Sequence, residues 1–411
     1  MTPEFAHSLS DSIALCRRTL NHKISHYLIR QLDDFEDDIA ERAHHFIGYP
    51  CNSGFHLNPL LDWWSHSLFS CVPCNEAGNP DEESSYALNM RPYEREVLEY
   101  FSNLYHFPKG GAWGYLTGGG TQGNEQGLYI GREKLKGHGK PILYVSKEAH
   151  YSIHSLAKIL DIDTRIVACT ENGEIDYSDL KQQLDRKRPA LFSLAIGTTF
   201  KGAIDQIDRV VELVKMKKVP AAYFHADAAL FGGFLPYLRD PQAPKIDFQK
   251  IPYDSIAVSG HKFYGSPVPV GVFLCRREHI QALSGDYIDY INAHNLTIPC
   301  SRSSLNTLIM WWTINSTSRM EFEEETAIIL ENAHYLLDSL RRISYPAWLN
   351  PFSNTVYFAA TSDILRKRWS LATTKCPFLG PLAHAVVMQH VTKEVIDHFV
   401  DELHQSSIKI V

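Results

Sequence analysis

Two residues of this chain, Lys262 and Asp227, are of the types that a Schiff-base enzyme needs. Lys262 lies in the run SGHKFYG (259–265), and Asp227 lies upstream in HADAA (225–229), at the end of an apolar stretch. A lysine amine forms a Schiff base with an aldehyde, and an aspartate carboxylate can keep a ring nitrogen protonated so that the ring accepts electrons. An ionised aspartate in so apolar a run is costly to bury without a partner. The pair predicts pyridoxal phosphate as cofactor; the alternatives are an aspartate bound to backbone amides and an ordinary lysine.

A glycine-rich turn, GGGTQGNE (118–125), precedes a predicted helix. Gly119 and Gly120 let the backbone approach an anion closely, and Thr121 opens a helix whose free amides and dipole attract a phosphate. The run lacks the lysine of a nucleoside-triphosphate loop and the spacing of a dinucleotide fingerprint. Because glycine turns before helices are common, this run indicates a phosphate site only in combination with other residues.

Polar residues also follow the other predicted strands. His150 can lie flat on an aromatic cofactor ring, or it can simply cap the helix that follows. Thr198 and Thr199 can orient this histidine or bind the cofactor, or they can form a plain turn. Ser259 and His261 flank the lysine, where both can bind a phosphate. Ligands bind at the carboxyl edge of open α/β sheets, so we expect all these residues to meet there.

The middle of the chain alternates short β-rich runs with helical segments, which predicts an α/β fold with helices on both faces of a mostly parallel sheet. We expect strands at 141–146, 164–169, 190–196, 221–226, 255–259 and 270–275, and helices at 122–135, 153–160, 177–186, 207–216 and, briefly, around Asp247.

The two ends of the chain differ from this middle part. Helical periodicity from about 10 to 46 predicts an N-terminal arm that packs on the body or on another subunit. Helices at 303–317, 321–343 and 392–405, with a strand at 355–359, predict a smaller α+β domain. The predicted divisions are a helical arm (1–50), a large cofactor-binding domain (51–295) and a small C-terminal domain (296–411).

Composition narrows the possible partners and locations. The chain has 411 residues, 44% hydrophobic and 21% charged, with a net charge of −7, which is ordinary for a globular protein. This charge gives no reason to expect nucleic acid or an anionic membrane as partner. The N-terminus lacks a basic region followed by an apolar core, and no apolar run is long enough for a membrane span. We expect a cytoplasmic protein.

Eight cysteines spread over the chain do not indicate a disulfide framework. Cys71 and Cys74 form the one close pair, but a zinc or redox site would need a second pair or a thioredoxin-like setting. We therefore expect free thiols and no metal site.

Taken together, these runs resemble the group II pyridoxal-phosphate amino-acid decarboxylases. The resemblance rests on GGT (119–121), EAHYS (148–152), GTT (197–199), HADAA (225–229) and SGHK (259–262), and it extends from about residue 48 to 403. The segments YIDYINAH (287–294), TIPCSR (297–302) and WSLA (369–372) are similar to bacterial histidine decarboxylases and plant serine decarboxylases. The family implies the aspartate aminotransferase-like fold type I, with a mostly parallel sheet of the seven-stranded type. It also implies a homodimer with active sites at the subunit interface, with further assembly left open.

The resemblance implies a role for each motif residue. Lys262 would carry the cofactor as a Schiff base, Asp227 would pair with the ring nitrogen, and His150 would stack on the ring and contact the substrate. The remaining cofactor contacts would come from Gly119, Gly120, Thr121, Thr198, Thr199, Ala229, Ser259 and His261. Tyr290, with Tyr287 second, is expected to return a proton to the substrate's α-carbon, and Ser353 is expected to lie near the substrate.

The implied activity is decarboxylation of L-histidine to histamine, with L-serine to ethanolamine as the alternative. SRSSL (301–305) stands where this branch often has SRNGH, so the side-chain specificity can differ from both. Another fold type I enzyme remains open: an aldolase, an aminotransferase or a sulfur-transferring lyase, for which Cys300 is the candidate nucleophile. A non-catalytic scaffold is the third class, and the joint presence of Lys262, Asp227 and His150 argues against it.

Overall fold

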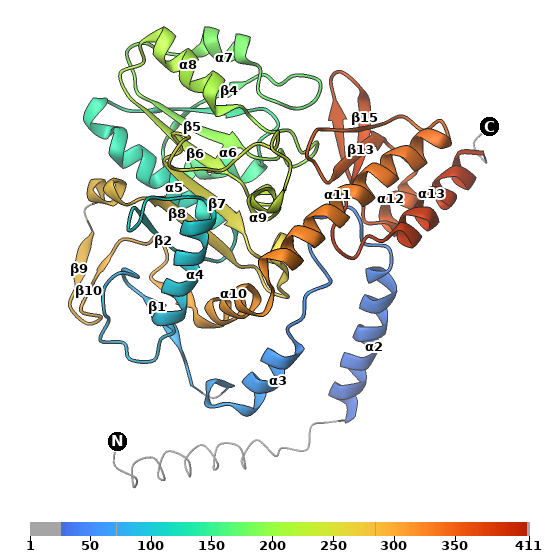
Figure 1. Ribbon diagram of the computed structural model, residues 1–411, viewed down its shortest axis with the longest axis horizontal. Helices are drawn as coiled ribbons and strands as arrows, with labels where there is room; N and C mark the ends of the chain where they lie inside the picture. Colours follow the sequence, from blue (N-terminus) through green and yellow to red (C-terminus); the bar gives the residue numbers. More distant parts are fainter. Residues whose placement is uncertain (1–25, 71, 284, 409–411) are drawn as a thin grey trace.

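A mixed seven-stranded sheet forms the centre of the computed structural model, which describes residues 26–70, 72–283 and 285–408 (Figure 1). The strands lie in the order β2-β8-β7-β6-β5-β3-β4. Their bounds are β2 (Ala112–Thr117), β3 (Ile142–Ser146), β4 (Asp163–Val167), β5 (Ala190–Ala195), β6 (Ala222–Asp227), β7 (Ser255–Ser259) and β8 (Gly271–Arg276). Neighbours from β7 to β4 are parallel, whereas β8 is antiparallel to both β7 and β2. The predicted α/β class is confirmed.

Alternate residues of these strands pack into cores on opposite faces of the sheet, as the period of a strand requires. Leu143 and Leu191 pack with helices α5 (Gly120–Leu135) and α6 (Tyr151–Ile159). Their chain neighbours Tyr144 and Phe192 belong to the other core. Residues of α4 (Arg91–Leu104), α7 (Tyr177–Gln183) and α8 (Ile207–Lys217) fill that second core. Because both faces are covered, the strand runs are continuously apolar.

The C-terminal part forms a separate four-stranded antiparallel sheet in the order β12-β13-β15-β14. The strands are β12 (Ala347–Leu349), β13 (Thr355–Ala359), β14 (Ala372–Cys376) and β15 (Gly380–Val386). Helices α11 (Arg319–Arg342), α12 (Asp363–Arg368) and α13 (Lys393–Ile408) pack on this sheet. Ile47 belongs to the same core, so the chain just after the N-terminal arm lies against the C-terminal sheet. Helix α10 (Ser304–Ser316) packs instead near α4 and α3 (Asn58–His66).

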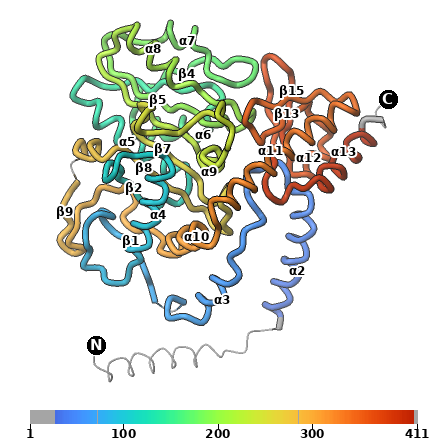
Figure 2. Tube along the Cα trace, in the orientation of Figure 1, coloured from blue at the N-terminus to red at the C-terminus, as the bar shows by residue number. Residues whose placement is uncertain are grey.

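The arm contains helix α2 (His26–Ala43), which projects from the body of the chain in Figures 1 and 2. Its apolar residues are exposed to solvent: Tyr27, Leu28, Ile29, Leu32, Phe35 and Ile39. The earlier part of the predicted helix lies outside the described residues. Within the described residues, no helix has both the length and the apolar character that crossing a membrane requires.

Two details differ from the predictions. The helix expected around Asp247 is wrong, because residues 248–250 form a turn in which the Asp247 carboxylate accepts hydrogen bonds from the amides of Gln249 and Lys250. Such a local side-chain-to-backbone bond is the usual competitor of a helix. Strand β2 was not predicted, since AWGYLT directly precedes the glycine turn and has little β-branched character.

Candidate active site

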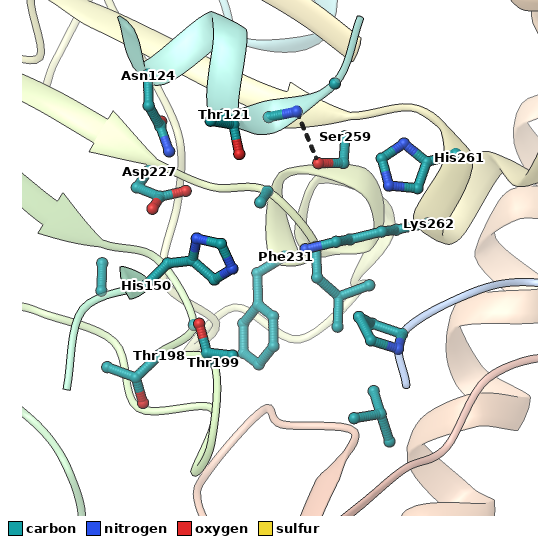
Figure 3. Close-up of a pocket in the computed structure, with 18 of the residues that line it drawn as sticks. Thr121, Asn124, His150, Thr198, Thr199, Asp227, Phe231, Ser259, His261 and Lys262 are labelled. Carbon is teal, nitrogen blue, oxygen red and sulfur yellow. Dashed lines mark hydrogen bonds between the residues drawn. The ribbon is translucent and has the colours of Figure 1, made fainter. Parts of the chain in front are cut away.

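One cavity of about 280 Å³ lies at the carboxyl ends of β5, β6 and β7, beside the N-terminus of α5 (Figure 3). It is lined by every residue that the sequence predicts to bind the cofactor: Gly119, Gly120, Thr121, His150, Thr198, Thr199, Asp227, Ala229, Ser259, His261 and Lys262. These residues are far apart in the sequence, and the parallel strands bring them to one edge of the sheet.

Lys262 lies in a single π-helical turn (His261–Gly265) that directly follows β7. Its amine is directed into the cavity (Figure 3). Burial lowers the pKa of this amine, and the nearby Asp227 carboxylate offsets part of that effect. A lysine with a lowered pKa has more of the neutral amine that attacks an aldehyde, so its surroundings suit Schiff-base formation.

Asp227 is the last residue of β6, and its carboxylate faces the same cavity. The carboxylate accepts no hydrogen bond from the described residues, and it acts electrostatically on Lys262 and His150. A partly buried carboxylate without a hydrogen-bond donor is costly. The protonated nitrogen of a pyridine ring would supply that donor, so the residues present fit the predicted cofactor.

At the start of α5, the amides of Thr121 and Gln122 have no hydrogen-bond partner among the described residues, whereas the amides of the glycine turn are bonded. The amide of Gly120 donates to Ser259 Oγ over 3.1 Å, which ties the turn to the end of β7. A Cβ atom at Gly120 would lie 2.6 Å from the same Oγ, so this close approach requires glycine. Thr121 follows in the first turn of the helix, where amides and dipole favour an anion. His261 lies beside this turn, since a Cβ atom at Gly119 would be 3.5 Å from its ring, and its Nδ1 bonds the Val270 carbonyl over 2.9 Å.

His150 satisfies both interpretations of its sequence position. It is the N-cap of α6, where Nδ1 accepts from the amide and hydroxyl of Ser152 at 3.3 and 2.7 Å. Its ring also projects into the cavity between Asp227 and Phe231 (Figure 3). Burial lowers the pKa of His150. The cap therefore fixes the orientation of a neutral ring beside the cofactor site.

A buried ion pair joins the loops that carry His150 and the two threonines. Lys201 is fully buried, and its Nζ lies 3.2 Å from Glu148 Oε1 and 3.1 Å from the Glu171 carbonyl. Thr198 Oγ1 accepts a hydrogen bond from the Ala203 amide, and this bond closes the turn from Thr198 to Ala203. Sequence reasoning did not identify this pair, because a lysine in a polar loop normally indicates a solvated side chain.

Three expected residues are not brought to the cavity. Tyr290 is 82% exposed on the turn between β9 (Asp286–Ile288) and β10 (Ala293–Asn295), and Tyr287 lies on the same hairpin. Ser353 is buried behind the cavity, where its hydroxyl accepts from the amide of Thr355. The roles of Tyr290 and Ser353 therefore stay predictions.

The cavity wall also contains residues that sequence reasoning did not assign, including Asn124, Phe231, Pro50 and Thr355. Asn124 could have been found, because it is four positions after Gly120 and so lies on the same helix face. Pro50 and Thr355 come from segments far from the motifs, and only the packing of the C-terminal sheet against the large one brings them here.

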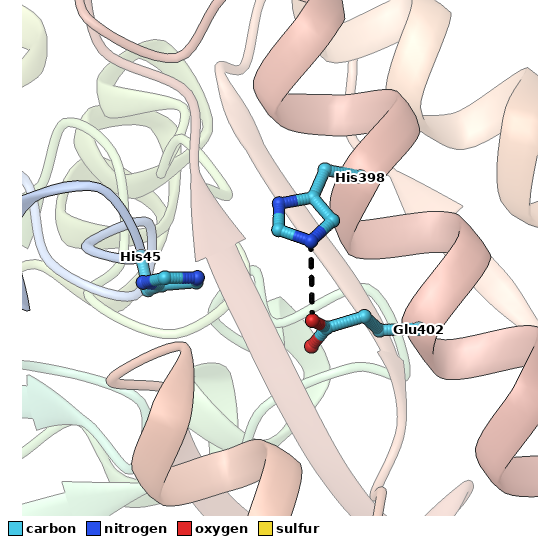
Figure 4. A group of neighbouring side chains, drawn as sticks. All are labelled: His45, His398 and Glu402. Atoms are coloured by element: carbon cyan, nitrogen blue, oxygen red, sulfur yellow. Dashed lines mark ion pairs between the residues drawn. The ribbon is translucent and has the colours of Figure 1, made fainter.

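Another group of potential metal ligands, His45, His398 and Glu402, lies away from this cavity (Figure 4). His398 bonds Glu402 over 3.1 Å, but Arg368 also pairs with this carboxylate at 3.0 Å and lies 3.3 Å from the His45 ring. The guanidinium already supplies the positive charge that the cluster needs, so the arrangement is explained without a metal.

The described cysteines are free thiols. Cys74 is half-buried, and Cys71, the other member of the close pair in the sequence, lies outside the described residues. Cys300 is exposed and does not line the cavity, which gives the sulfur-transfer alternative no support.

The fold and the cavity define the class: the chain has the fold type I architecture, and the residues that line its cavity fit pyridoxal phosphate. L-methionine decarboxylase from Streptomyces sp.590 superimposes with a TM-score of 0.83 at 23% identity, covering 93% of this chain and 95% of that one. Glutamate decarboxylase of Lactobacillus brevis gives a TM-score of 0.75 at 18% identity, covering 95% and 93%.

Sequence comparison identifies the family. Residues 131–345 match the pyridoxal-dependent decarboxylase conserved domain. Serine decarboxylase 1 of Oryza sativa subsp. japonica is 37% identical over 373 residues, covering 90% of this chain and 74% of that protein. Histidine decarboxylase of Solanum lycopersicum is 36% identical over 383 residues, covering 91% and 88%. Histidine decarboxylase of Vibrio campbellii is 35% identical over 387 residues, covering 93% and 95%. The chain belongs to the pyridoxal-dependent decarboxylase family, its cofactor is pyridoxal phosphate, and its activity is amino-acid decarboxylation.

Proposed function

We propose that this protein decarboxylates L-histidine to histamine and carbon dioxide, using Lys262, Asp227 and His150. The observation that carries the site assignment is that the Lys262 amine and the Asp227 carboxylate face one cavity beside the free amides of α5. When bound, pyridoxal phosphate supplies a ring that accepts the electrons of the bond to the leaving carboxylate.

The chain's own residues would divide the remaining tasks. The amides around Gly120 and the N-terminus of α5 hold the phosphate, while Ser259 braces that turn. Asp227 retains the proton on the ring nitrogen, so that the ring stays electron-poor. Lys262 would hold the cofactor through its amine, which burial keeps partly neutral. His150, held by its cap, packs on the ring and limits the orientations of the bound substrate.

Histidine is preferred to serine as substrate because histidine decarboxylases from both a plant and a bacterium match over nearly their full lengths. L-Serine to ethanolamine is the second candidate, supported by the rice serine decarboxylases at similar identity. Ser303 and Ser304, part of the segment that departs from the branch, do not line the cavity of the single chain.

A homodimer with shared active sites is part of the proposal. Leu32 and Phe35 on α2 are 64% and 60% exposed in the single chain, on an apolar face that a second subunit would cover. Tyr290 lies on a hairpin remote from its own cavity, so we propose that it donates its proton in the partner's site. We place this dimer in the cytoplasm, where free cysteines persist.

The experiment is a panel of L-amino acids incubated with the holoenzyme, with carbon dioxide and amine both quantified. We expect histamine and carbon dioxide in equal amounts, and Lys262→Ala should abolish both. Ethanolamine from serine would instead support the second candidate. A keto acid in place of the amine would contradict the proposed reaction. Lys250→Ala, at an exposed lysine on the 248–250 turn away from the cavity, is the control and should leave the turnover unchanged.

A further inference from the structure

We propose that Asn124 is a positioning residue for Asp227: its side-chain amide, which makes no hydrogen bond to Asp227 in this structure, donates to the Asp227 carboxylate once the cofactor is bound and keeps it oriented toward the ring nitrogen. This inference rests on the proposed pairing of Asp227 with the cofactor. Asn124 lies on α5 and lines the cavity, and Figure 3 shows its amide group directed toward Asp227.

The orientation of Asn124 is fixed from behind by His225. The ring of His225 is completely buried, with Nε2 at 2.8 Å from Asn124 Oδ1 and Nδ1 at 2.8 Å from Ser255 Oγ. Burial lowers the pKa of His225 to about 3, so the ring is neutral and has one N–H. Because the amide oxygen of Asn124 only accepts, Nε2 must donate to it and Nδ1 must accept from the serine hydroxyl.

Because the Asn124 amide oxygen is bonded to His225, the two N–H groups of this amide are left to face the cavity. Asp227 is two residues after His225 on the same strand, so both project from the same face of β6 toward α5. Helix and strand approach closely here, since a Cβ atom at Gly127 would lie 2.3 Å from His225 Nδ1.

The residue types fit this task better than a packing role does. A buried histidine with both nitrogens bonded, next to an asparagine at a cavity wall, is a polar network inside an apolar sheet. Such networks define one side-chain orientation at the cost of desolvation. The Asp227 carboxylate lies at the end of this network and accepts no hydrogen bond from the described residues.

The test compares cofactor affinity for two ligands, pyridoxal phosphate and its carbocyclic analogue in which C–H replaces the ring nitrogen. Apoenzyme fluorescence gives each Kd, so the readout does not depend on turnover. Wild type should prefer pyridoxal phosphate by about tenfold or more, the worth of a charge-assisted hydrogen bond. Asn124→Asp keeps the oxygen that accepts from His225 but removes the donor, and it should reduce this preference to about threefold or less.

Gln122→Glu is the matched control. It adds the same charge to the same helix turn, and its Oε1 can still accept from the Gly118 amide. It should change both Kd values by one common factor and keep their ratio. Asn124→Leu, checked for folding by circular dichroism, gives a second reading in which the donor is lost without added charge.

The outcomes separate this inference from the proposed function. If the wild type binds both ligands equally, the pairing of Asp227 with the ring nitrogen is wrong and the inference falls with it. If the wild type discriminates and both Asn124 variants discriminate as strongly, the pairing stands and the role of Asn124 is overturned.

Discussion

Replacing Lys201 by methionine should destabilise the protein far more than the loss of an ordinary lysine. Lys201 is fully buried, and its Nζ bonds Glu148, the Glu171 carbonyl and Cys376 Sγ at 3.2, 3.1 and 3.5 Å. Methionine keeps the length of the side chain but none of these bonds. The Glu148 side chain, only 16% exposed, would then have lost its cationic partner.

The magnitude follows from the burial of the pair. Removing one partner of a buried ion pair costs about 3–5 kcal/mol, because the remaining charge stays desolvated. Glu148 retains some solvent contact, so we expect about 3 kcal/mol. The surface pair of Lys140 and Asp163, 3.1 Å apart with side chains 51% and 46% exposed, offers a matched control. Lys140→Met should leave the free energy of unfolding nearly unchanged, because solvent screens an exposed pair.

Urea titrations at fixed protein and pyridoxal phosphate concentrations measure the free energy of unfolding of each variant. The double variant Lys201→Met with Glu148→Gln should lose less than the sum of the single losses, because no charge is left unpaired. Glu148 precedes His150 by two residues, so Lys201→Met should also weaken cofactor binding. A loss no larger than that of Lys140→Met, with additive double-variant energies, would refute this explanation of the loop geometry.

Three other perturbations have defined outcomes. Gly120→Ala places a Cβ atom 2.6 Å from Ser259 Oγ and should weaken cofactor binding by about tenfold or more, as measured by fluorescence titration. Gly137→Ala is the control, because a Cβ atom at Gly137 has no other atom within 4 Å. Burial raises the pKa of Asp205 from 3.8 to about 7. Between pH 3.8 and about 7, the folded state therefore holds a proton on Asp205 that the unfolded state has lost. The resulting stabilisation of the folded state, up to about 4 kcal/mol, is complete below pH 3.8 and is lost as the pH rises through 7. Unfolding titrations from pH 4 to 8 should show that slope, and a similar slope in Asp205→Asn would assign it elsewhere. Leu32→Glu with Phe35→Glu should shift a dimer toward monomer in light scattering, whereas Glu36→Lys should not; an unchanged mass would exclude α2 from the interface.

The motif residues that line the cavity were predictable because each occupies a strand end or a helix start, which local sequence patterns indicate. The apolar runs before Asp227 and Ser259 indicate strands, and the glycines before Thr121 indicate a turn into a helix. In an open parallel sheet those positions meet at one edge, whatever the loop lengths between them. Fold class and cavity membership follow from the same few patterns.

Other parts depend on packing that no local pattern encodes. Whether Lys201 is solvated or buried is decided by Glu148 and Cys376, which come from distant segments. The hydrogen bond between His225 and Asn124 joins a strand to a helix, and neither segment alone indicates it. Tyr290 was chosen by resemblance, and in the proposed dimer it would act in the partner's site.

Borohydride reduction of the holoenzyme, followed by peptide mapping, tests the central claim most directly. Reduction fixes the cofactor to whichever lysine holds it, and the predicted result is one modified peptide that carries the label on Lys262. Lys201 is the internal reference, because it lies in a neighbouring loop but bonds Glu148 outside the cavity wall. An unmodified Lys262, or a label on any other lysine, would contradict the account of this active site.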